Sequence, residues 1–196
     1  MVPPCYPGAM PAVMMALMLD PAVGTLLVAC FALLFASAAA HKLRDLRHFT
    51  EVLAAYHVLP AGGERLAPLV AVLELTVAVG LLATPVRAPA TLAAMTVLLA
   101  YAAAIAMNLA RGRRDLDCGC GVPGTSHPIA PWMVVRNLLL ALLLAVSLIP
   151  WENRQLLPTD ALTVGAGLAV ATLLYGSLDR LLGRLNARTA LMRGPR

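Results

Sequence analysis

Five long apolar segments constrain the fold of this chain more than any other feature. The first, 23–40, contains no charged residue, and about 20 such residues at about 1.5 Å each cross the hydrocarbon core of a bilayer. The whole chain is 60% hydrophobic and 13% charged. A soluble domain carries about a quarter charged residues. We therefore predict an all-α integral membrane protein, with a four-helix transmembrane bundle and a fifth C-terminal transmembrane segment.

The boundaries of these segments predict the domain organisation. Asp20 and Pro21 are typical of a helix start, an N-cap residue followed by proline at the first helical position. Between the first two spans, Leu46, Phe49 and Leu53 recur at helical spacing beside charged residues. This pattern predicts an amphipathic helix at 43–57 that lies in the membrane interface. We expect an N-terminal tail at 1–19, a membrane domain at 20–150 with spans at 21–40, 66–84, 90–110 and 130–150, a fifth span at 160–182 and a basic cytoplasmic tail at 183–196.

Two local features refine this organisation. The tail at 1–19 is apolar but contains no Lys or Arg, so it lacks the basic n-region of a signal peptide and is expected to be a loose or interfacial segment. The fifth span contains Gly165, Gly167 and Gly176, small residues that suit close packing between membrane helices.

The basic residues predict the orientation. With five spans, twelve Lys and Arg residues fall on the side that holds the first-to-second loop, the third-to-fourth loop and the C-terminus, and two fall on the other side. Cytoplasmic loops carry the excess of Lys and Arg. We therefore expect a multi-pass plasma-membrane protein with its N-terminus outside and its C-terminus in the cytoplasm. The same clusters account for the net charge of +5, so a nucleic-acid partner is not expected.

Several polar residues lie inside the spans at similar depth. Glu74 is about 12 Å and Arg136 about 9 Å from the cytoplasmic ends of their spans, by helix rise. Ionisable groups in a bilayer face the bundle interior and pair, so we predict a Glu74–Arg136 ion pair. Asn108, Asn137 and His41 lie toward the same face and complete a predicted polar cluster. The pair either locks two helices together or also shapes a polar pocket.

The loop between the third and fourth spans holds the residues with the most distinctive chemistry. Cys118 and Cys120 flank a single glycine in R-G-R-R-D-L-D-C-G-C-G at 111–121. Two cysteines at this spacing can close a small, strained disulfide, and strained, accessible disulfides are the oxidising and labile ones. Two soft ligands could instead hold Cu(I), with His127 as a third ligand, or the cysteines could be structural. A closed zinc site needs four ligands, so no metal site is predicted.

Motifs across 20–150 resemble a known family. They are H-K-L-R-D-L-R-H-F at 41–49, A-Y-H-V-L-P at 55–60, Glu74, the run from Tyr101 to Gly121 and W-M-V-V-R-N at 132–137. The chain resembles the methylamine utilisation protein MauE and the wider DoxX-like membrane proteins. The resemblance implies a four-helix membrane bundle, with Cys118 and Cys120 matching the C-G-C pair of the family. Gly121, Val122 and Pro123 follow the pair here, where the family usually has Phe-Gly.

The resemblance also implies a function. It points to maturation of a disulfide-rich extracytoplasmic protein, as for the small subunit of methylamine dehydrogenase, alongside a thioredoxin-like partner. We expect Cys118 and Cys120 to carry thiol–disulfide chemistry, so that the chain would be a component of a membrane thiol–disulfide oxidoreductase. A quinone in the bilayer is one electron acceptor that would suit this chemistry. The alternatives are a copper- or small-solute-handling membrane protein and a non-catalytic assembly scaffold.

Overall fold

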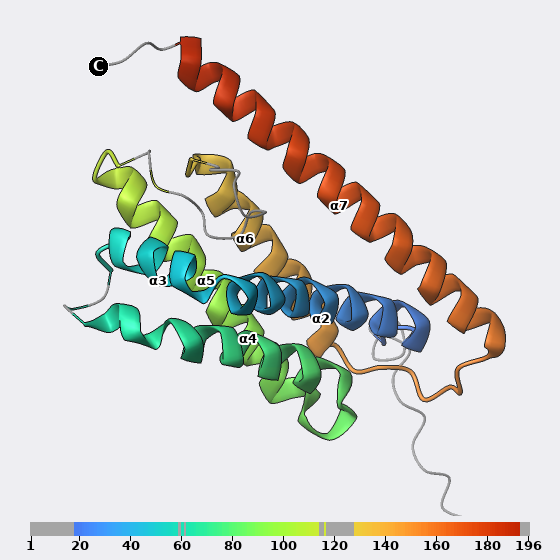
Figure 1. Ribbon diagram of the computed structural model, residues 1–196. Helices are drawn as coiled ribbons and strands as arrows, with labels where there is room; N and C mark the ends of the chain where they lie inside the picture. The colour runs from blue at the N-terminus through green and yellow to red at the C-terminus, as the bar shows by residue number, and fades with distance from the viewer. Residues whose placement is uncertain (1–17, 59, 61, 114–115, 117–127, 193–196) are drawn as a thin grey trace, which may run out of the picture.

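The computed structural model describes residues 18–58, 60, 62–113, 116 and 128–192, which form helices joined by short connections (Figure 1). Helix α2 (Pro21–Arg44) begins as expected, because the Asp20 side chain accepts a hydrogen bond from the Ala22 amide at 2.7 Å. Asp45 interrupts the helix. Its side chain accepts a hydrogen bond from the His48 amide at 3.0 Å and so starts α3 (Leu46–Ala55).

The remaining helices follow the other four apolar segments. They are α4 (Ala67–Leu82) after the 3-10 turn η1 (Gly63–Leu66), α5 (Arg87–Ala110) after η2 (Thr84–Val86), α6 (Pro131–Ala145) running into η3 (Val146–Leu148), and α7 (Pro158–Met192). Five of the described helical segments are long and apolar enough to cross a membrane. The all-α membrane fold is therefore confirmed. Helix α7 continues past the expected span end at residue 182 into the segment that we expected to be a basic tail.

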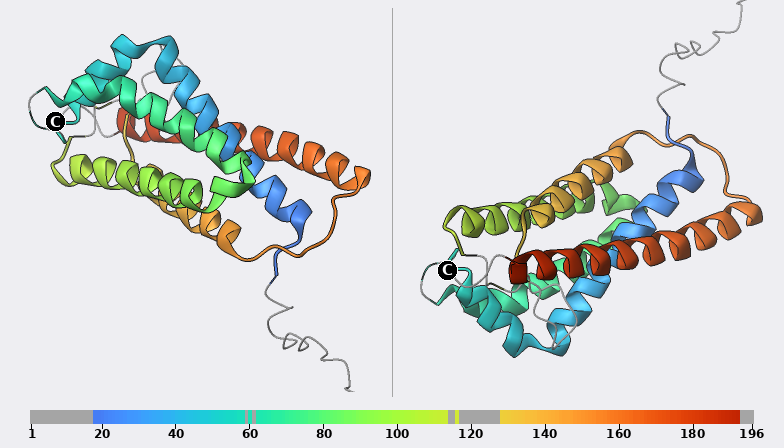
Figure 2. Two further views of the ribbon diagram at one scale, coloured as in Figure 1. Left: turned by 90° about the horizontal axis from the view of Figure 1, so that it is seen from below. Right: turned by 90° about the horizontal axis from the view of Figure 1, so that it is seen from above.

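The bundle is built from two close helix pairs. Helix α2 packs against α4, α5 packs against α6, and α4 joins the pairs by packing against α5 (Figures 1 and 2). Phe31 and Phe35 of α2 fill the core between them. On the outside, Leu142 is 68%, Leu162 76% and Leu173 70% exposed. Apolar exposure on this scale is typical of a surface that faces lipid.

The short helix α3 has the amphipathic character that the sequence predicts. Phe49 and Val52 are buried against the bundle, whereas Arg47, His48 and Glu51 are exposed. Its apolar face thus closes one end of the bundle and its charged face points away.

Helix α7 lies against one side of the bundle and approaches only α2 closely among the described helices (Figure 1). Gly167 permits this approach, because a Cβ atom there would lie 2.8 Å from Cδ2 of Leu26. A Cβ atom at Gly165 or Gly176 would meet nothing within 4 Å. Of the three glycines that the sequence suggested for close packing, Gly167 therefore has that role.

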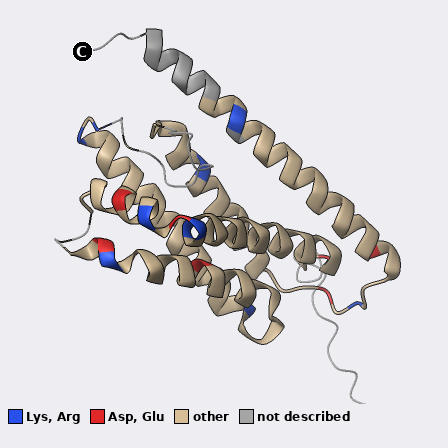
Figure 3. Cartoon of the chain, viewed as in Figure 1, with Lys and Arg blue, Asp and Glu red and all other residues tan. Residues whose placement is uncertain are grey.

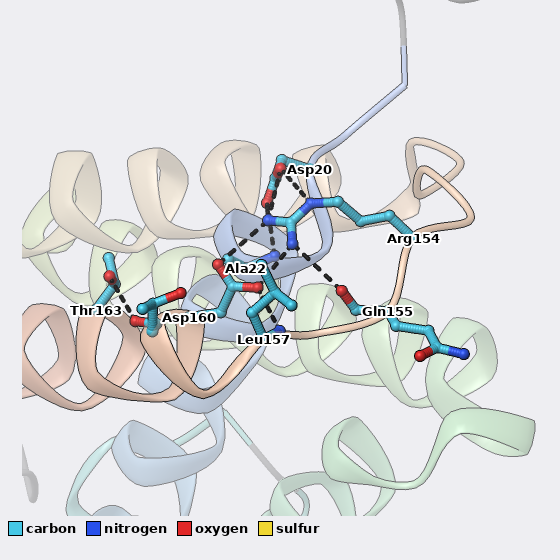
Figure 4. A network of polar contacts seen from close by, with 8 residues as sticks. Asp20, Ala22, Arg154, Gln155, Leu157, Asp160 and Thr163 are labelled. Carbon is cyan, nitrogen blue, oxygen red and sulfur yellow. Dashed lines mark hydrogen bonds and ion pairs between the residues drawn. The ribbon is translucent and has the colours of Figure 1, made fainter.

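An ion-pair network joins the first turns of α2 and α7 (Figure 4). The Arg154 guanidinium donates to Asp20 at 3.0 Å and to Asp160 at 2.6 Å. The Ala22 amide and the Arg154 guanidinium both hold the pKa of Asp20 below its usual range. Hydrogen bonds to Asp160 and Asp20 raise the pKa of Arg154. Both Asp20 and Arg154 are therefore charged at neutral pH, and the network attaches the start of α7 to the bundle.

Candidate functional site: a polar cavity inside the bundle

A buried ion pair lies between α2 and α4. The Nζ atom of Lys42 lies 2.8 and 2.9 Å from the two carboxylate oxygens of Glu74, and the two side chains are 3% and 1% exposed. Tyr101 of α5 donates its hydroxyl hydrogen to Glu74 Oε1. The Lys42 ammonium also lies 5.2 Å from the ring centroid of Phe49 and 5.3 Å from that of Tyr101. Aromatic faces at this distance attract a cation, so one charge pair joins four helices.

The position of Lys42 follows from the periodicity of α2. Its buried residues include Val28, Phe35, Ala39 and Lys42, which are three, four or seven positions apart and so share one face. Lysine thus occupies the last position of the core stripe. The next residues, Leu43 and Arg44, are exposed.

This geometry corrects the predicted Glu74–Arg136 ion pair. In the described part of the chain, Glu74 forms its ion pair with Lys42, and no ion pair joins it to Arg136. The Arg136 guanidinium carbon instead lies 5.1 Å from the ring centroid of Trp132, one turn earlier on α6. Their similar depth does bring Glu74 and Arg136 to the same part of the bundle. However, α4 packs closely against α2, and Lys42 lies on the face of α2 that contacts α4.

Glu74 and Arg136 line a common cavity of about 220 Å³. Residues from α2, α4, α5, α6 and α7 line it, so it lies inside the bundle. His41 and Asn137, two further members of the predicted polar cluster, line it as well. The Asn137 side chain donates to the Met133 carbonyl at 2.9 Å within its own helix. The structure therefore places four of the five predicted cluster residues around one cavity.

Asn108, the fifth residue, lies outside this cavity and ties α3 to α5. Its amide nitrogen donates to the Tyr56 carbonyl at 3.1 Å and to the Ala104 carbonyl at 3.0 Å, and its side chain is fully buried. Its Oδ1 atom accepts from Arg113 at 3.3 Å. Asn108 thus fixes the end of α5 that leads into the C-G-C segment.

Cys118 and Cys120 lie outside the described residues, and so does His127. The positions on either side of the segment are described. The Ile129 amide donates to the Leu116 carbonyl at 3.0 Å, and Ile129 is 2% exposed. The two ends of the C-G-C segment are therefore joined at the end of the bundle that α3 closes.

Basic residues gather at this same end (Figure 3). Arg111 donates to the backbone carbonyl of His57 at 3.4 Å, and the Arg113 guanidinium lies 3.2 Å from the ring Nδ1 atom of His57. Lys42 belongs to the buried site and no longer counts as a loop charge. Eleven of the twelve Lys and Arg residues assigned to this side then remain, against Arg87 and Arg154 on the other.

Sequence reasoning left three residues of the site out of the predicted polar cluster: Lys42, Tyr101 and Tyr175. The 3–4 spacing of the α2 core stripe would have indicated Lys42, as described above. Tyr101 is a polar aromatic residue in a helix whose other ionisable group, Arg87, is its first residue. Tyr175 reaches the cavity from α7. The sequence offers no signal for Tyr175, because nothing in it shows against which helix α7 packs.

Comparison with known proteins agrees with this architecture. The model of the family described as methylamine utilisation protein MauE matches residues 20–150, which include every predicted cluster residue and both cysteines of the C-G-C pair. The chain belongs to the MauE family. It is 43% identical over 162 residues to the methylamine utilization protein MauE of Paracoccus denitrificans, covering 81% of this chain and 87% of that protein.

Two other MauE proteins show similar agreement. The protein of Methylophilus methylotrophus is 36% identical over 169 residues, which cover 84% of this chain and 88% of that protein. The protein of Methylorubrum extorquens is 41% identical over 129 residues, covering 65% and 69%. No solved structure gives a significant match. The MauE family match ends at residue 150, so Tyr175 and the rest of α7 lie beyond it.

Proposed function

We propose that this chain supports thiol–disulfide exchange in the maturation of an extracytoplasmic, disulfide-rich protein of methylamine utilisation, with Cys118 and Cys120 as the reacting pair. The C-G-C spacing supports the redox part of the proposal, and the MauE relatives, which are named as methylamine utilization proteins, support its methylamine part. A thioredoxin-like protein would be the exchange partner. The bundle would serve as the membrane scaffold that holds the pair.

The hydrogen bond between Leu116 and Ile129 is the observation that supports this proposal best. It joins the ends of the C-G-C segment beside Arg111 and Arg113. Cationic neighbours favour the thiolate form, which is the form that attacks disulfides. The neighbouring carboxylates of Asp115 and Asp117 would disfavour the thiolate. The positive charges of Arg111 and Arg113 would therefore be needed to offset them.

The exchange needs two steps, and it conserves electrons. One thiolate of the pair attacks a sulfur of the partner disulfide, which forms a mixed disulfide and releases one partner thiolate. The second cysteine then attacks the mixed disulfide, which forms the Cys118–Cys120 disulfide and releases the second partner thiol. Two electrons pass from this chain to the partner, and the reverse sequence oxidises a dithiol client.

The test is to trap the intermediate. Replacing a single cysteine, Cys118→Ser or Cys120→Ser, removes the resolving thiol, so one of the two variants should accumulate a mixed disulfide that a reducing agent releases. In the unaltered chain, the cysteines should change from alkylatable thiols to a disulfide as the buffer becomes more oxidising. The midpoint should be less negative than roughly −300 mV, because structural disulfides have potentials below that value. Cys30→Ser is the control, because this described thiol lies within α2, away from the pair in the sequence.

Two results would contradict the redox proposal. Thiols that stay alkylatable in every oxidising buffer, with no trapped partner, would do so. Full client maturation by the Cys118→Ser/Cys120→Ser variant would indicate a non-catalytic scaffold instead. Copper binding that this double variant loses would indicate metal handling.

The proposal includes an orientation with the N-terminus outside and the C-terminus in the cytoplasm. The C-G-C loop then lies at the cytoplasmic face, so electrons would have to pass through the bilayer between the cysteine pair and the extracytoplasmic client. The bias of eleven basic residues against two supports this orientation. Reporter fusions at Gly8 and Arg196 should therefore be active outside and inside, respectively. A C-terminal reporter that is active only outside would overturn this orientation.

A further inference from the structure

A groove lies between α7 and the neighbouring helices α2 and α6. Helix α7 approaches α2 closely but no other described helix. Two adjoining cavities of about 510 and 420 Å³ lie along α7 and form the groove. Most side chains that line them are apolar, including Leu26, Leu33, Leu139 and Leu178. The groove lies along segments that span the membrane, so a hydrocarbon chain is the ligand chemistry that it suits.

The groove meets the polar cavity at one place. Leu140 of α6 and Tyr175 of α7 line all three cavities, and Ser37 of α2 lines the larger groove cavity and the polar one. An apolar groove therefore leads to a cavity with a polar lining, which includes Arg136, Asn137 and Tyr175. Such a site fits an amphiphile whose head accepts hydrogen bonds.

A second observation concerns Trp132, which lines the groove near Arg136. Its indole nitrogen is buried and has no hydrogen-bond partner in the structure described here. Buried donors usually have an acceptor. An oxygen on the head of a ligand in this groove would supply one.

The size and depth of the polar cavity favour a neutral ring over a phospholipid head. Its volume of about 220 Å³ exceeds the roughly 150 Å³ that is enough to bind benzene. Tyr101, on its wall, lies nine residues before the end of α5, about 14 Å by helix rise. Phospholipid head groups stay at the interface, above this depth.

We propose that this site binds a membrane quinone, with its ring where the groove meets the polar cavity at Arg136 and Tyr175, and with its isoprenoid tail along the groove. The proposal rests on the redox function proposed above for Cys118 and Cys120. When that dithiol becomes a disulfide it loses two electrons and two protons, and a quinone that takes up both becomes the quinol. A quinone would thus connect the C-G-C pair at the inner face with an acceptor that moves freely in the bilayer.

Tryptophan fluorescence tests the binding site directly. The chain has two tryptophans, Trp132 in the groove and Trp151, which packs against Gly24 and Arg87. Decylubiquinone should quench the fluorescence of the purified protein in detergent saturably, and should do so equally in the Trp151→Phe variant. Decanol, which has a similar tail and no ring, should not quench and should compete only at a much higher concentration.

A pair of matched variants locates the site. Ser37→Phe fills the junction of groove and cavity and should raise the apparent Kd for decylubiquinone about tenfold or more, a loss of at least about 1.4 kcal/mol. Ser177→Phe makes the same change on α7 at an exposed position that lines none of the three cavities, and should leave the Kd unchanged. Non-saturable quenching, equal quenching in Ser37→Phe, or competition by decanol at the same concentration as decylubiquinone would overturn the quinone site.

The cysteine variant separates this proposal from the redox function. Cys118→Ser/Cys120→Ser should bind decylubiquinone normally, whereas quinol formation, measured by absorbance, should require the reduced cysteine pair. Binding without quinol formation in the unaltered protein would contradict the redox role of the cysteines and support the site itself. Quinol formation without saturable binding would contradict the site.

Discussion

Lys42→Met should lower the free energy of unfolding by about 3–5 kcal/mol, because it leaves the Glu74 carboxylate buried without its cation. Glu74→Gln should have a similar effect by leaving the Lys42 ammonium unpaired. Both can be measured by denaturant titration of the protein in detergent, or by the yield of folded protein. Glu51→Gln on the exposed face of α3 is the matched control and should change stability little.

The double variant distinguishes a direct pair from two independent losses. Lys42→Met/Glu74→Gln should recover part of the stability, because neither charge is then left alone. The same cycle with Arg136→Gln in place of Lys42→Met should show weaker coupling, since Arg136 shares the cavity but does not pair with Glu74. Stronger coupling of Glu74 to Arg136 than to Lys42 would contradict the geometry described here.

Asn108→Leu is expected to cost about 1–3 kcal/mol, the penalty for a buried polar group that loses its partner. The substitution removes the donor of the Tyr56 carbonyl and the acceptor of Arg113. Hydrogen exchange should therefore accelerate in α3 as well as in the last turn of α5.

Asn137→Leu is the control for this effect. Asn137 is also buried, but its amide donates to a carbonyl of its own helix, so no described hydrogen bond between helices is lost. The control should change the exchange of α3 little. Equal effects of the two substitutions on α3 would show that Asn108 does not hold that helix.

The sequence predicts the helices well because each depends on a local property. Apolar length defines the spans, and Asp20 with Pro21 marks the start of α2. The alternation of charged and apolar residues indicates α3, with Phe49 and Val52 on its buried face. Each of these signals lies within a few neighbouring residues, so packing between helices does not change it.

Predicting the site from sequence is harder, because depth along a helix does not define which face of that helix points inward. Glu74 and Arg136 have similar depth, yet α4 packs against α2, and Lys42 therefore reaches the carboxylate. Lys42 also stands in a basic stretch, H-K-L-R-D-L-R-H, where its neighbours Arg44 and Arg47 are exposed. The cavity and the groove require the placement of α7, which the sequence does not contain.

The positions of the two ion-pair partners along their helices also bear on the order in which the protein is assembled in the membrane. Lys42 is the third residue from the end of α2, so before α4 is present its long side chain can extend to the aqueous interface. Glu74 is the eighth of sixteen residues in α4, and its shorter side chain cannot reach the aqueous interface from there. The α2–α4 hairpin therefore has to close as α4 enters the bilayer, and Tyr101 completes the contact when the next helix arrives. Biogenesis thus depends on the first helix being in place with its lysine ready before the second is released into lipid.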